Sequence, residues 1–524
     1  MAGPASHEEE MQLSGLPRAI VTVGCMIGTL MQALDATIAN VSLPYMQGSL
    51  SASYDEITWV LTSYVIAAAI MTAPVGWLAA QYGRKNIFLI SLVGFTVSSM
   101  MCGVATSLGE MVMDRLLQGV FGAALVPLSQ STMLDIYPVE KRGSAMAIWG
   151  VGVMIGPILG PTLGGYLTYF YNWRYVFFVN VPFGIAAVLA LGAFMPKRAR
   201  RPASGQFDWI GFAVLSLFLG SLQIMLDRGQ EKDWFGSPEI VTFAVLAVIG
   251  LYLFIVHMMT AKNPFIPRGV FADRNLNAGL ITMFAVGSVL LSSATLMPPF
   301  LEKLGNYPVE TAGLVMAPRG IGTMGAMMLA GRLSNRIDPR ALMAAGFALL
   351  VVSFWMMMQW LPSSPQSYMI ETLIVQGMGL GFVFTPLQVV AFYTLPQALR
   401  TQGTSLLSLM RNIGMAVGIS VTEAVQVQMA QVNHATLAYH VTPFSRNLQV
   451  GGAVSRLLDP MTHAGAALLN ATLDQQAQII SFIDAFKFMM VISIPTMLCL
   501  LLMRRPPQAA MAAKAEKPEM AVME

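Results

Sequence analysis

Long apolar segments, separated by short polar ones, make up most of this 524-residue chain. A run of about 20 apolar residues is long enough to cross the hydrocarbon core of a bilayer as a helix. Fourteen such runs occur, and they predict fourteen transmembrane helices. Their approximate limits are 18–46, 57–80, 86–106, 110–134, 144–168, 175–195, 207–226, 239–260, 275–298, 310–331, 340–361, 366–391, 403–428 and 484–503.

The composition agrees with this pattern. Hydrophobic residues make up 55% of the chain, charged residues only 11%, and the mean hydropathy is +0.63. A soluble protein of this length needs more charge to cover its surface, so we predict an all-α polytopic membrane protein in contact with the lipid bilayer. The net charge of +3 is small and gives no indication of a nucleic-acid partner, and none is predicted. The three cysteines lack metal-type spacing, so no metal site is predicted.

Lysine and arginine are distributed unequally between the two ends of the predicted helices. Of the 30 in the chain, twenty fall on the side that carries both termini, six on the other side and four within spans. Cytoplasmic loops of membrane proteins carry such an excess of cations. The sequence therefore predicts a multi-pass protein with both termini in the cytoplasm.

Two short stretches recur at nearly one offset. The segment Gly76–Lys85 after span 2 is echoed by Gly331–Arg340, 255 residues later. Gln118 and Gly119 in span 4 are echoed, 258 residues later, by the Gln-Gly pair at 376–377. Internal repeats of this size are typical of transporters. We expect a tail at 1–17, a six-helix bundle at 18–200, two linker helices at 201–262, a second six-helix bundle at 263–505 with an external loop at 429–483, and a tail at 506–524.

Asp35 is the one carboxylate in the first apolar segment. A charge near the middle of a span costs at least about 3 kcal/mol, so it is usually retained for a function. A carboxylate that binds and releases a proton suits proton-coupled transport. Counting residues from the span ends places Arg115 of span 4 within reach of Asp35. The matching position in the second half is Leu373, so the pair belongs to one half only. A static ion pair that only supports the fold is the alternative.

Four further segments carry recognisable motifs. Leu34–Pro44 is similar to the pattern L-D-x-T-I-v-N-v-a-l-P, Arg115–Gly119 to a proton-transfer motif of a fourth helix, and Trp173–Pro182 to W-R-w-i-F-f-i-N-v-P. Together they resemble the major facilitator superfamily, and specifically its fourteen-helix drug:proton antiporters of the EmrB/QacA type. The segment Gly220–Gly229 resembles the EmrB branch of that family. The resemblance covers about residues 15–505.

This resemblance implies a major facilitator fold with two six-helix bundles and two linker helices. It implies proton coupling at Asp35 and Arg115, supported by Gln118 and Gly119 of the helix-4 motif. The implied function is proton-driven export of amphipathic toxic compounds from the bacterial inner membrane, powered by the proton gradient without a cofactor. An EmrA-like periplasmic adaptor and a TolC-like outer-membrane channel are the implied partners.

Two other functions remain as alternatives at this stage. A narrow-specificity exporter of one metabolite or fatty acid fits the same residues. A membrane enzyme would need a metal-spaced His/Cys cluster, a G-x-S-x-G or H-E-x-x-H motif or a phosphate loop, and the sequence has none. We therefore predict a secondary active transporter and not an enzyme.

Span 5 resembles the family's antiporter motif. Such glycines clear one face of a helix for close packing, and prolines bend it. A flexible helix between the two bundles is expected, and a simple packing seam is the alternative. The motif residues are Gly152, Gly156, Pro157, Gly160, Pro161 and Gly164.

The loop after span 2 keeps Gly76, Gly83 and Arg84 of the family's gating motif. Ala80 and Gln81 stand where the motif usually has Asp and Arg. A charge-relay clasp built on that Asp is therefore not expected. Arg84 is expected to pair with the end of a neighbouring helix, or alternatively to serve only as a topology anchor.

Three intramembrane polar residues are candidates for a substrate cavity: Asn40, Arg319 and Arg411. A membrane-embedded arginine meets either an anionic substrate or a partner in its own bundle. The external loop at 429–483 mixes polar and apolar residues, which favours short amphipathic helices where an adaptor docks. A lid or an unstructured insertion is the alternative for this loop.

Overall fold

The computed structural model describes residues 13–138, 141–196, 207–334, 337–441 and 461–503, and these residues form helices and no strands. Each predicted span coincides with one helix or with two consecutive helices. The single helices are α1 (Gly15–Ser49), α5 (Arg84–Val104), α8 (Arg142–Phe170), α11 (Trp209–Gly229), α12 (Pro238–Thr260), α13 (Arg274–Pro299), α14 (Val309–Leu333), α15 (Pro339–Met357), α16 (Gln366–Val390), α17 (Arg400–His440) and α20 (His463–Cys499). The pairs are α3 (Trp59–Thr72) with α4 (Val75–Tyr82), α6 (Leu108–Gly122) with α7 (Leu125–Ile136), and α9 (Tyr175–Phe178) with α10 (Asn180–Phe194).

Length and apolar character support membrane spans. In the described part of the chain, eleven helices are long and apolar enough to cross a membrane, and the pair α3–α4, bent by 56°, makes a twelfth. Pro74 lies at that bend, where its ring and missing N–H interrupt the helical hydrogen bonds. Helices α8 and α14, with 29 and 25 residues, are also long enough to span about 30 Å. The all-helical membrane fold is confirmed, and the helices agree with the predicted count of fourteen.

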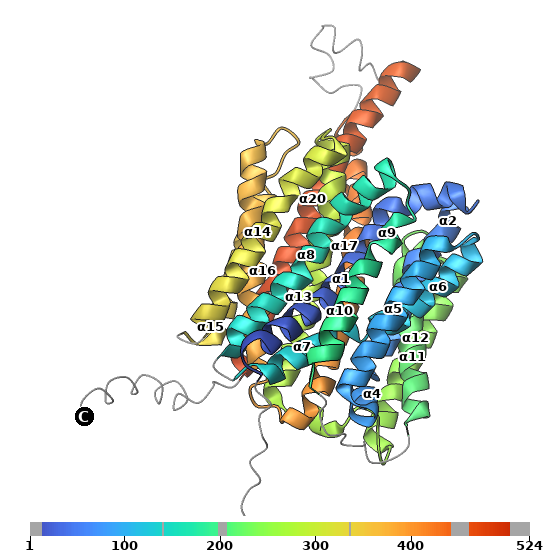
Figure 1. Cartoon of the computed structure of the whole chain (residues 1–524). Coiled ribbons are helices and arrows are strands. Elements are labelled where there is room, and N and C mark those ends of the chain that lie inside the picture. The colour runs from blue at the N-terminus through green and yellow to red at the C-terminus, as the bar shows by residue number, and fades with distance from the viewer. Residues whose placement is uncertain (1–12, 139–140, 197–206, 335–336, 442–460, 504–524) are drawn as a thin grey trace, which may run out of the picture.

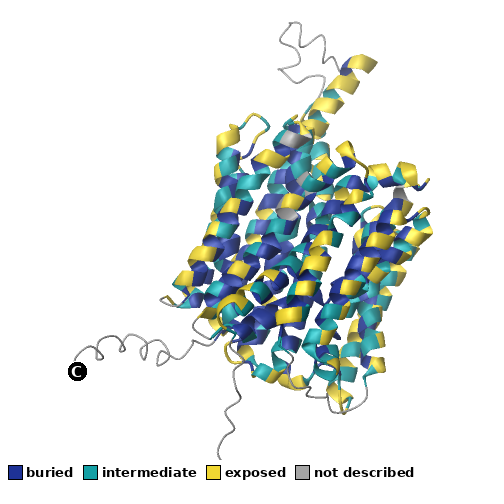
Figure 2. Ribbon diagram, in the orientation of Figure 1, coloured by how far each residue is buried: buried dark blue, intermediate teal, exposed yellow. Residues whose placement is uncertain are grey.

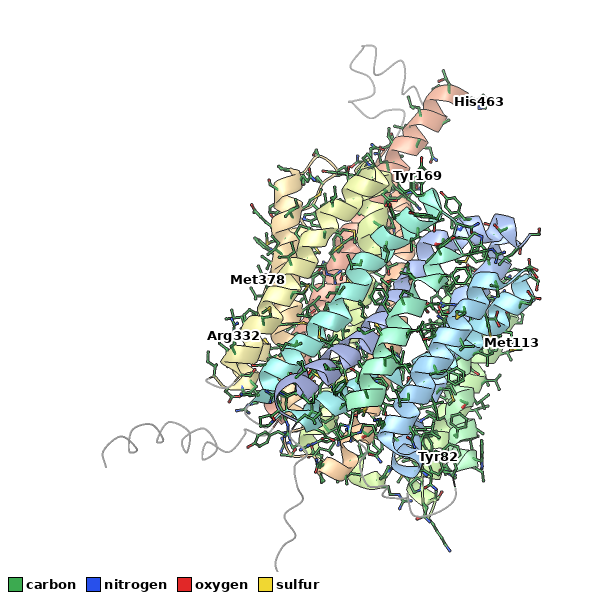
Figure 3. All side chains as sticks on the ribbon, in the orientation of Figure 1. Tyr82, Met113, Tyr169, Arg332, Met378 and His463 are labelled. Carbon is green, nitrogen blue, oxygen red and sulfur yellow. The ribbon has the colours of Figure 1, made fainter. Side chains whose placement is uncertain are left out.

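The helices stand side by side in one bundle (Figure 1). We call the lower end in this view, where α1 and α17 begin, the basal end. The upper end, with α9 and the short helix α2 (Tyr54–Ile57), is the apical end. Tyr82 and Arg332, which close α4 and the last turn of α14, both lie toward the basal end (Figure 3). The two recurring sequence stretches therefore lie at one end of the molecule.

Helix packing in the second half repeats that in the first. Helix α1 packs along α8 and α3 along α6, while α13 packs along α17 and α14 along α16. The linker helices α11 and α12 pack on each other, and α11 also contacts α3 and α17. Central helices are enclosed on most sides and peripheral ones are not (Figure 2). In the 18-residue apolar stretch of each helix, 72% of the residues of α16 are buried, against 17% of those of α12. Helix α12 thus presents its surface to lipid.

The external loop differs from the expected short helices. Helices α17 and α20 instead continue without a break for 41 and 37 residues, or about 60 and 55 Å. Both exceed the roughly 30 Å of a hydrocarbon core, and α20 projects from the apical end (Figure 1). We call residues 429–440 and 463–483 the apical hairpin. Residues 442–460 of the predicted loop lie outside the described residues.

Side chains connect the two helices near the apical end. Asn433 Nδ2 donates to Asp484 Oδ2 at 3.1 Å, and the His434 ring lies 3.0 Å from Asn470 Oδ1. Gln426 Nε2 donates to Ser481 Oγ at 3.2 Å, closer to the bundle. These contacts join α17 and α20 as an antiparallel pair. The sequence predicted helical segments here, but neither their continuity with the membrane spans nor their pairing, because both depend on contacts between distant segments.

Candidate functional site

Asp35 lies at the centre of a buried polar network. Arg115 donates from Nη1 to Asp35 Oδ2 at 2.6 Å, and Gln118 donates from Nε2 to Oδ1 at 2.8 Å. The side chains of Asp35 and Arg115 are 0% and 1% exposed. The predicted ion pair therefore forms, and the helix-4 motif supplies two of the groups that hold the carboxylate.

Helix α6 positions these groups through local sequence. Ser107 and Glu110 form a capping box that fixes where the helix begins. Arg115 and Gln118 are three residues apart and so share one face, where Arg115 Nη1 also donates to Gln118 Oε1 at 2.8 Å. Gly119 lets α6 approach α3, because a side chain there would meet the carbonyl of Tyr64.

The guanidinium of Arg115 is held on the α3 side as well. Its Nε donates to the Val60 carbonyl at 3.0 Å, and its carbon lies 4.3 Å from the centre of the Tyr64 ring. Such a cation–π contact stabilises a desolvated arginine. Arg115 therefore has neutral partners in addition to the Asp35 carboxylate.

Asn180 completes the network. Its Nδ2 donates to Asp35 Oδ1 at 3.3 Å and to Ser99 Oγ at 3.0 Å, while Ser99 donates to the Phe177 carbonyl at 2.9 Å. Asn180 was not predicted as a site residue, although it lies in the motif Trp173–Pro182. The sequence feature that could have identified Asn180 is its polar amide within an apolar stretch, which forms the first turn of α10.

The glycines of span 5 pack against α1 beside this network. A Cβ atom at Gly156 would lie 2.6 Å from the Ala33 backbone, and one at Gly164 would meet the Ile38 carbonyl. Gly160 faces Thr37, and Gly152 faces Met26. The glycine face thus forms a close seam with α1, while α8 also packs on α14 and α16 of the second half, so α8 lies between the two bundles. Pro157 and Pro161 lie in α8, but their side chains lie outside the described residues.

A second cluster of charges joins the two halves at the basal end. Arg84 Nη1 donates to Asp135 Oδ2 at 2.7 Å, and Arg400 Nη1 donates to Asp135 Oδ1 at 3.1 Å. We call these three residues the basal clasp. A clasp built on the motif Asp was not expected, since Ala80 stands there, and the carboxylate comes instead from Asp135 of α7. Arg84 does pair with the end of a neighbouring helix, as predicted.

The glycines of the gating loop shape this end. Gly83 has φ +89°, a conformation that favours glycine, and it links α4 to α5. Gly76 lets α4 approach α17, because a Cβ there would lie 2.9 Å from the Cα of Gln402. Gln130 and Gln388, which are 258 residues apart, also bond to each other across the two halves. The basal end is therefore held together by contacts between the two halves.

Comparison with known proteins now identifies the chain. The sequence profile described as "Major Facilitator Superfamily" matches residues 25–419. The multidrug export protein EmrB of Escherichia coli (strain K12) is 35% identical over 443 residues, 84% of this chain and 86% of EmrB. The fatty acid resistance protein FarB of Neisseria gonorrhoeae is 32% identical over 474 residues, 90% of this chain and 94% of FarB. The chain is an EmrB-type member of the major facilitator superfamily.

Solved structures agree with this assignment at the level of the fold. The human organic anion transporter MFSD10 superposes with a TM-score of 0.57 at 14% identity, covering 95% of this chain and 100% of its own. The proton:xylose symporter XylE gives a TM-score of 0.55 at 13% identity, covering 92% of this chain and 94% of its own. The predicted major facilitator fold is thereby confirmed. Family membership makes the chain a membrane transporter, as predicted, rather than an enzyme.

The three predicted cavity residues of this EmrB-type transporter lie on three different helices, α1, α14 and α17. Asn40 is exposed on α1, and in the described part of the chain it bonds to neither arginine. Arg319 of α14 donates from Nη2 to the Leu290 carbonyl and to Ser293 Oγ, each at 3.0 Å. Arg411 of α17 is buried at 6% exposure. The two arginines belong to the second half, away from the Asp35 network.

Proposed function

We propose that this transporter exports amphipathic toxic compounds in exchange for protons across the bacterial inner membrane, with both termini in the cytoplasm. The observation that carries the proposal is the buried Asp35 network. Arg115, Gln118 and Asn180 enclose the Asp35 carboxylate, which can bind one proton. Binding of that proton would neutralise the carboxylate and so weaken its ion pair with Arg115. Inward movement of one positive charge releases about 2.3 kcal/mol per 100 mV.

Protonation changes the forces on α1. The charged carboxylate attracts Arg115 on α6 and accepts bonds from α6 and α10. A proton removes the charge and weakens these bonds, while Arg115 stays bonded to the Val60 carbonyl. Because Gly156 holds α8 against the backbone next to Asp35, a shift of α1 is passed to α8.

The basal clasp and the contacts beside it then control whether the basal end is open or closed. Arg84 and Asp135 lie in the first half and Arg400 in the second. Opening the basal end requires Arg400 to leave Asp135, while the Arg84–Asp135 pair stays within its half. Gly143 of α8 and the Gly331 carbonyl of α14 also pack closely at this end and must part. In the proposed orientation, the described state is closed toward the cytoplasm.

Proton exchange can be tested in inside-out vesicles from a host that lacks other pumps. The lumen is first acidified by respiration, and an amphipathic dye or drug is then added. The wild-type protein should accumulate the drug and raise the lumenal pH at the same time, whereas vesicles without it should do neither. Drug accumulation that persists after the pH gradient has been collapsed would contradict proton coupling.

A narrow substrate range remains a second candidate, because FarB, named for fatty acid resistance, matches this chain about as well as EmrB does. A resistance panel in the same host separates the two. Protection against several unrelated amphipathic compounds supports broad export, and protection against a single class supports the narrow alternative.

We further propose that the apical hairpin docks an EmrA-like periplasmic adaptor, which leads to a TolC-like channel. The hairpin rises beyond the membrane on the proposed periplasmic side. It leaves large apolar side chains in solvent: Tyr439 is 82% exposed, Val432 49% and Leu468 46%. Exposed apolar groups clustered on one element are typical of a protein contact surface.

Shortening the hairpin tests this partnership. Deleting 435–440 together with 463–468 should abolish resistance in intact cells, since drug would no longer pass to an outer channel. Proton-driven drug uptake into inside-out vesicles should remain within about twofold of wild type, because no helix is cut within the membrane. Unchanged cellular resistance would exclude the hairpin as the docking site.

A further inference from the structure

The second half contains a counterpart of the Asp35 network that lacks a carboxylate. Gly119 packs against the Tyr64 carbonyl in the first half, and Gly377 packs against the Arg319 carbonyl in the second. Arg319 therefore occupies the place of Tyr64. At the 258-residue offset that relates Gln118 to Gln376, Arg115 corresponds to Leu373 and Asp35 to Ser293.

The charges of these two networks differ. In the first half the guanidinium of Arg115 faces the Asp35 carboxylate at 2.6 Å. In the second half the guanidinium of Arg319 faces Ser293, and its two acceptors are neutral oxygens. Among the described residues, no acid forms an ion pair with Arg319. The second network thus has the cation of the first without its anion.

The side-chain amide of Gln376, in this second network, also lacks hydrogen-bond partners. Gln376 is 0% exposed, and neither its Nε2 nor its Oε1 has a hydrogen-bond partner in the described structure. Its counterpart Gln118 binds Asp35 and Arg115. A buried amide without partners is costly, so the unpaired Gln376 amide points to a ligand group that bonds to it. Oγ of Ser292, next to Ser293, is buried and unpaired as well.

Arg411 adds a second cation to the same side of α13. Gly287 of α13 lets α17 approach so closely that a Cβ there would lie 2.4 Å from the Arg411 carbonyl. Leu290, which binds Arg319, is one turn further along α13. Arg411 is buried, its Nε lacks a partner, and no hydrogen bond or ion pair to its side chain occurs within the described ranges. Two buried cations without an acid require a counter-ion.

An apolar crevice adjoins this cationic site. It lies between the two halves and is narrow in this conformation. Leu290, whose carbonyl binds Arg319, forms part of its wall, and Leu380 lies one turn from Gln376 on the same face of α16. The lining residues are Met154, Val286, Leu290, Met327, Leu380 and Phe384. A polar head at the arginines would therefore have an apolar wall beside it for its tail.

We propose that Arg319, Gln376 and Arg411 form the head-group site for amphipathic carboxylic acids in their anionic form. The substrate carboxylate takes the place that Asp35 has in the first half: it accepts hydrogen bonds from the guanidinium of Arg319 and the amide of Gln376, with Arg411 as the second cation. This inference rests on the proposed export function and adds the charge class of the preferred substrate.

Binding of two probes that share one tail tests the proposal. The full-length protein in phosphatidylcholine nanodiscs is titrated with radiolabelled decanoate and with decyltrimethylammonium, without any ion gradient. Arg319→Gln should weaken decanoate binding at least tenfold and leave decyltrimethylammonium within twofold, whereas Arg319→Lys should retain most of the affinity for decanoate. Gln376→Glu should abolish decanoate binding, because it supplies the missing carboxylate from the protein.

Arg340→Gln is the matched control, since Arg340 lies in the same half but pairs with Asp338 at the basal end. Equal losses for both probes with Arg319→Gln, or no loss for decanoate, would overturn the proposal. If adding phosphatidylglycerol weakens decanoate binding to wild type but not to Arg319→Gln, the site belongs to lipid head groups, and the proposal also fails.

Export of a neutral dye into inside-out vesicles separates this inference from the proposed function. Proton-driven dye export by Arg319→Gln at the wild-type rate, together with selective loss of decanoate binding, supports both. Retained dye export with unchanged decanoate binding overturns only the anion site. Wild-type protein that binds decanoate selectively but exports no dye in response to a proton gradient overturns the proposed function and leaves the site standing.

Discussion

Asp35→Asn is expected to reduce drug-driven proton release from inside-out vesicles to the level of vesicles without the protein. The amide is nearly the same size as the carboxylate and can still accept a hydrogen bond from Arg115, but it binds no proton at physiological pH. Substrate binding, measured without a gradient, should stay within about threefold of wild type, because Asp35 is fully buried and does not line a surface. Loss of proton release with retained substrate binding would therefore show that the variant is folded but no longer couples transport to protons.

Two variants serve as controls for this result. Asp35→Glu keeps a titratable group and should retain measurable coupling at a reduced rate. Asp114→Asn changes the acid next to Arg115 in sequence, which forms no ion pair in the described part of the chain, and it should couple like wild type. Proton release that persists in Asp35→Asn would show that another group carries the proton and that the Arg115 pair is a static support of the fold.

Gly156→Val is expected to lower export at least tenfold in protein that still inserts into the membrane. The new Cβ would lie 2.6 Å from the Ala33 backbone and 2.7 Å from the Leu34 nitrogen, one residue before Asp35. Backbone atoms cannot turn aside as a flexible side chain does, so α1 must move. Overpacking of this kind typically costs about 1–3 kcal/mol and displaces the helix.

Gly325→Val is the matched control for that change. Gly325 lies in the interior of α14, and a Cβ there would meet nothing within 4 Å. It should export drug within about twofold of wild type, as measured by dye uptake into inside-out vesicles. Equal losses for both variants would indicate a general cost of β-branched residues in these helices, and not a specific seam between α8 and α1.

Several features could be predicted because they depend on local or periodic properties. A bilayer imposes helices of about 20 apolar residues, so the predicted spans coincide with observed helices, and their ends differ most at α17 and α20, which extend past the predicted limits. The high cost of a buried charge makes Asp35 and Arg115 conspicuous, and the constant rise of a helix predicts that they meet, as they do at 2.6 Å.

Other features depend on packing between segments that are far apart in the chain. Asp135 at the end of α7 has no distinguishing neighbours in the sequence, and only the approach of α17 gives it Arg400 as well as Arg84. Asn180 reaches Asp35 only because α10 packs on α1. The sequence predicted short helices in the external loop, but only the pairing of α17 with α20 shows that they continue the two membrane helices as a hairpin.

The sequence by itself therefore determined that this is an all-helical membrane protein and marked the acid in its first helix, since both depend on the cost of placing polar groups in lipid. Only the tertiary structure decided which groups complete the Asp35 network, where the basal clasp finds its carboxylate, and that Arg319 and Gln376 repeat that network without an acid. Those relations are set by which helix faces meet, and close approach at Gly119, Gly156 and Gly377 fixes them.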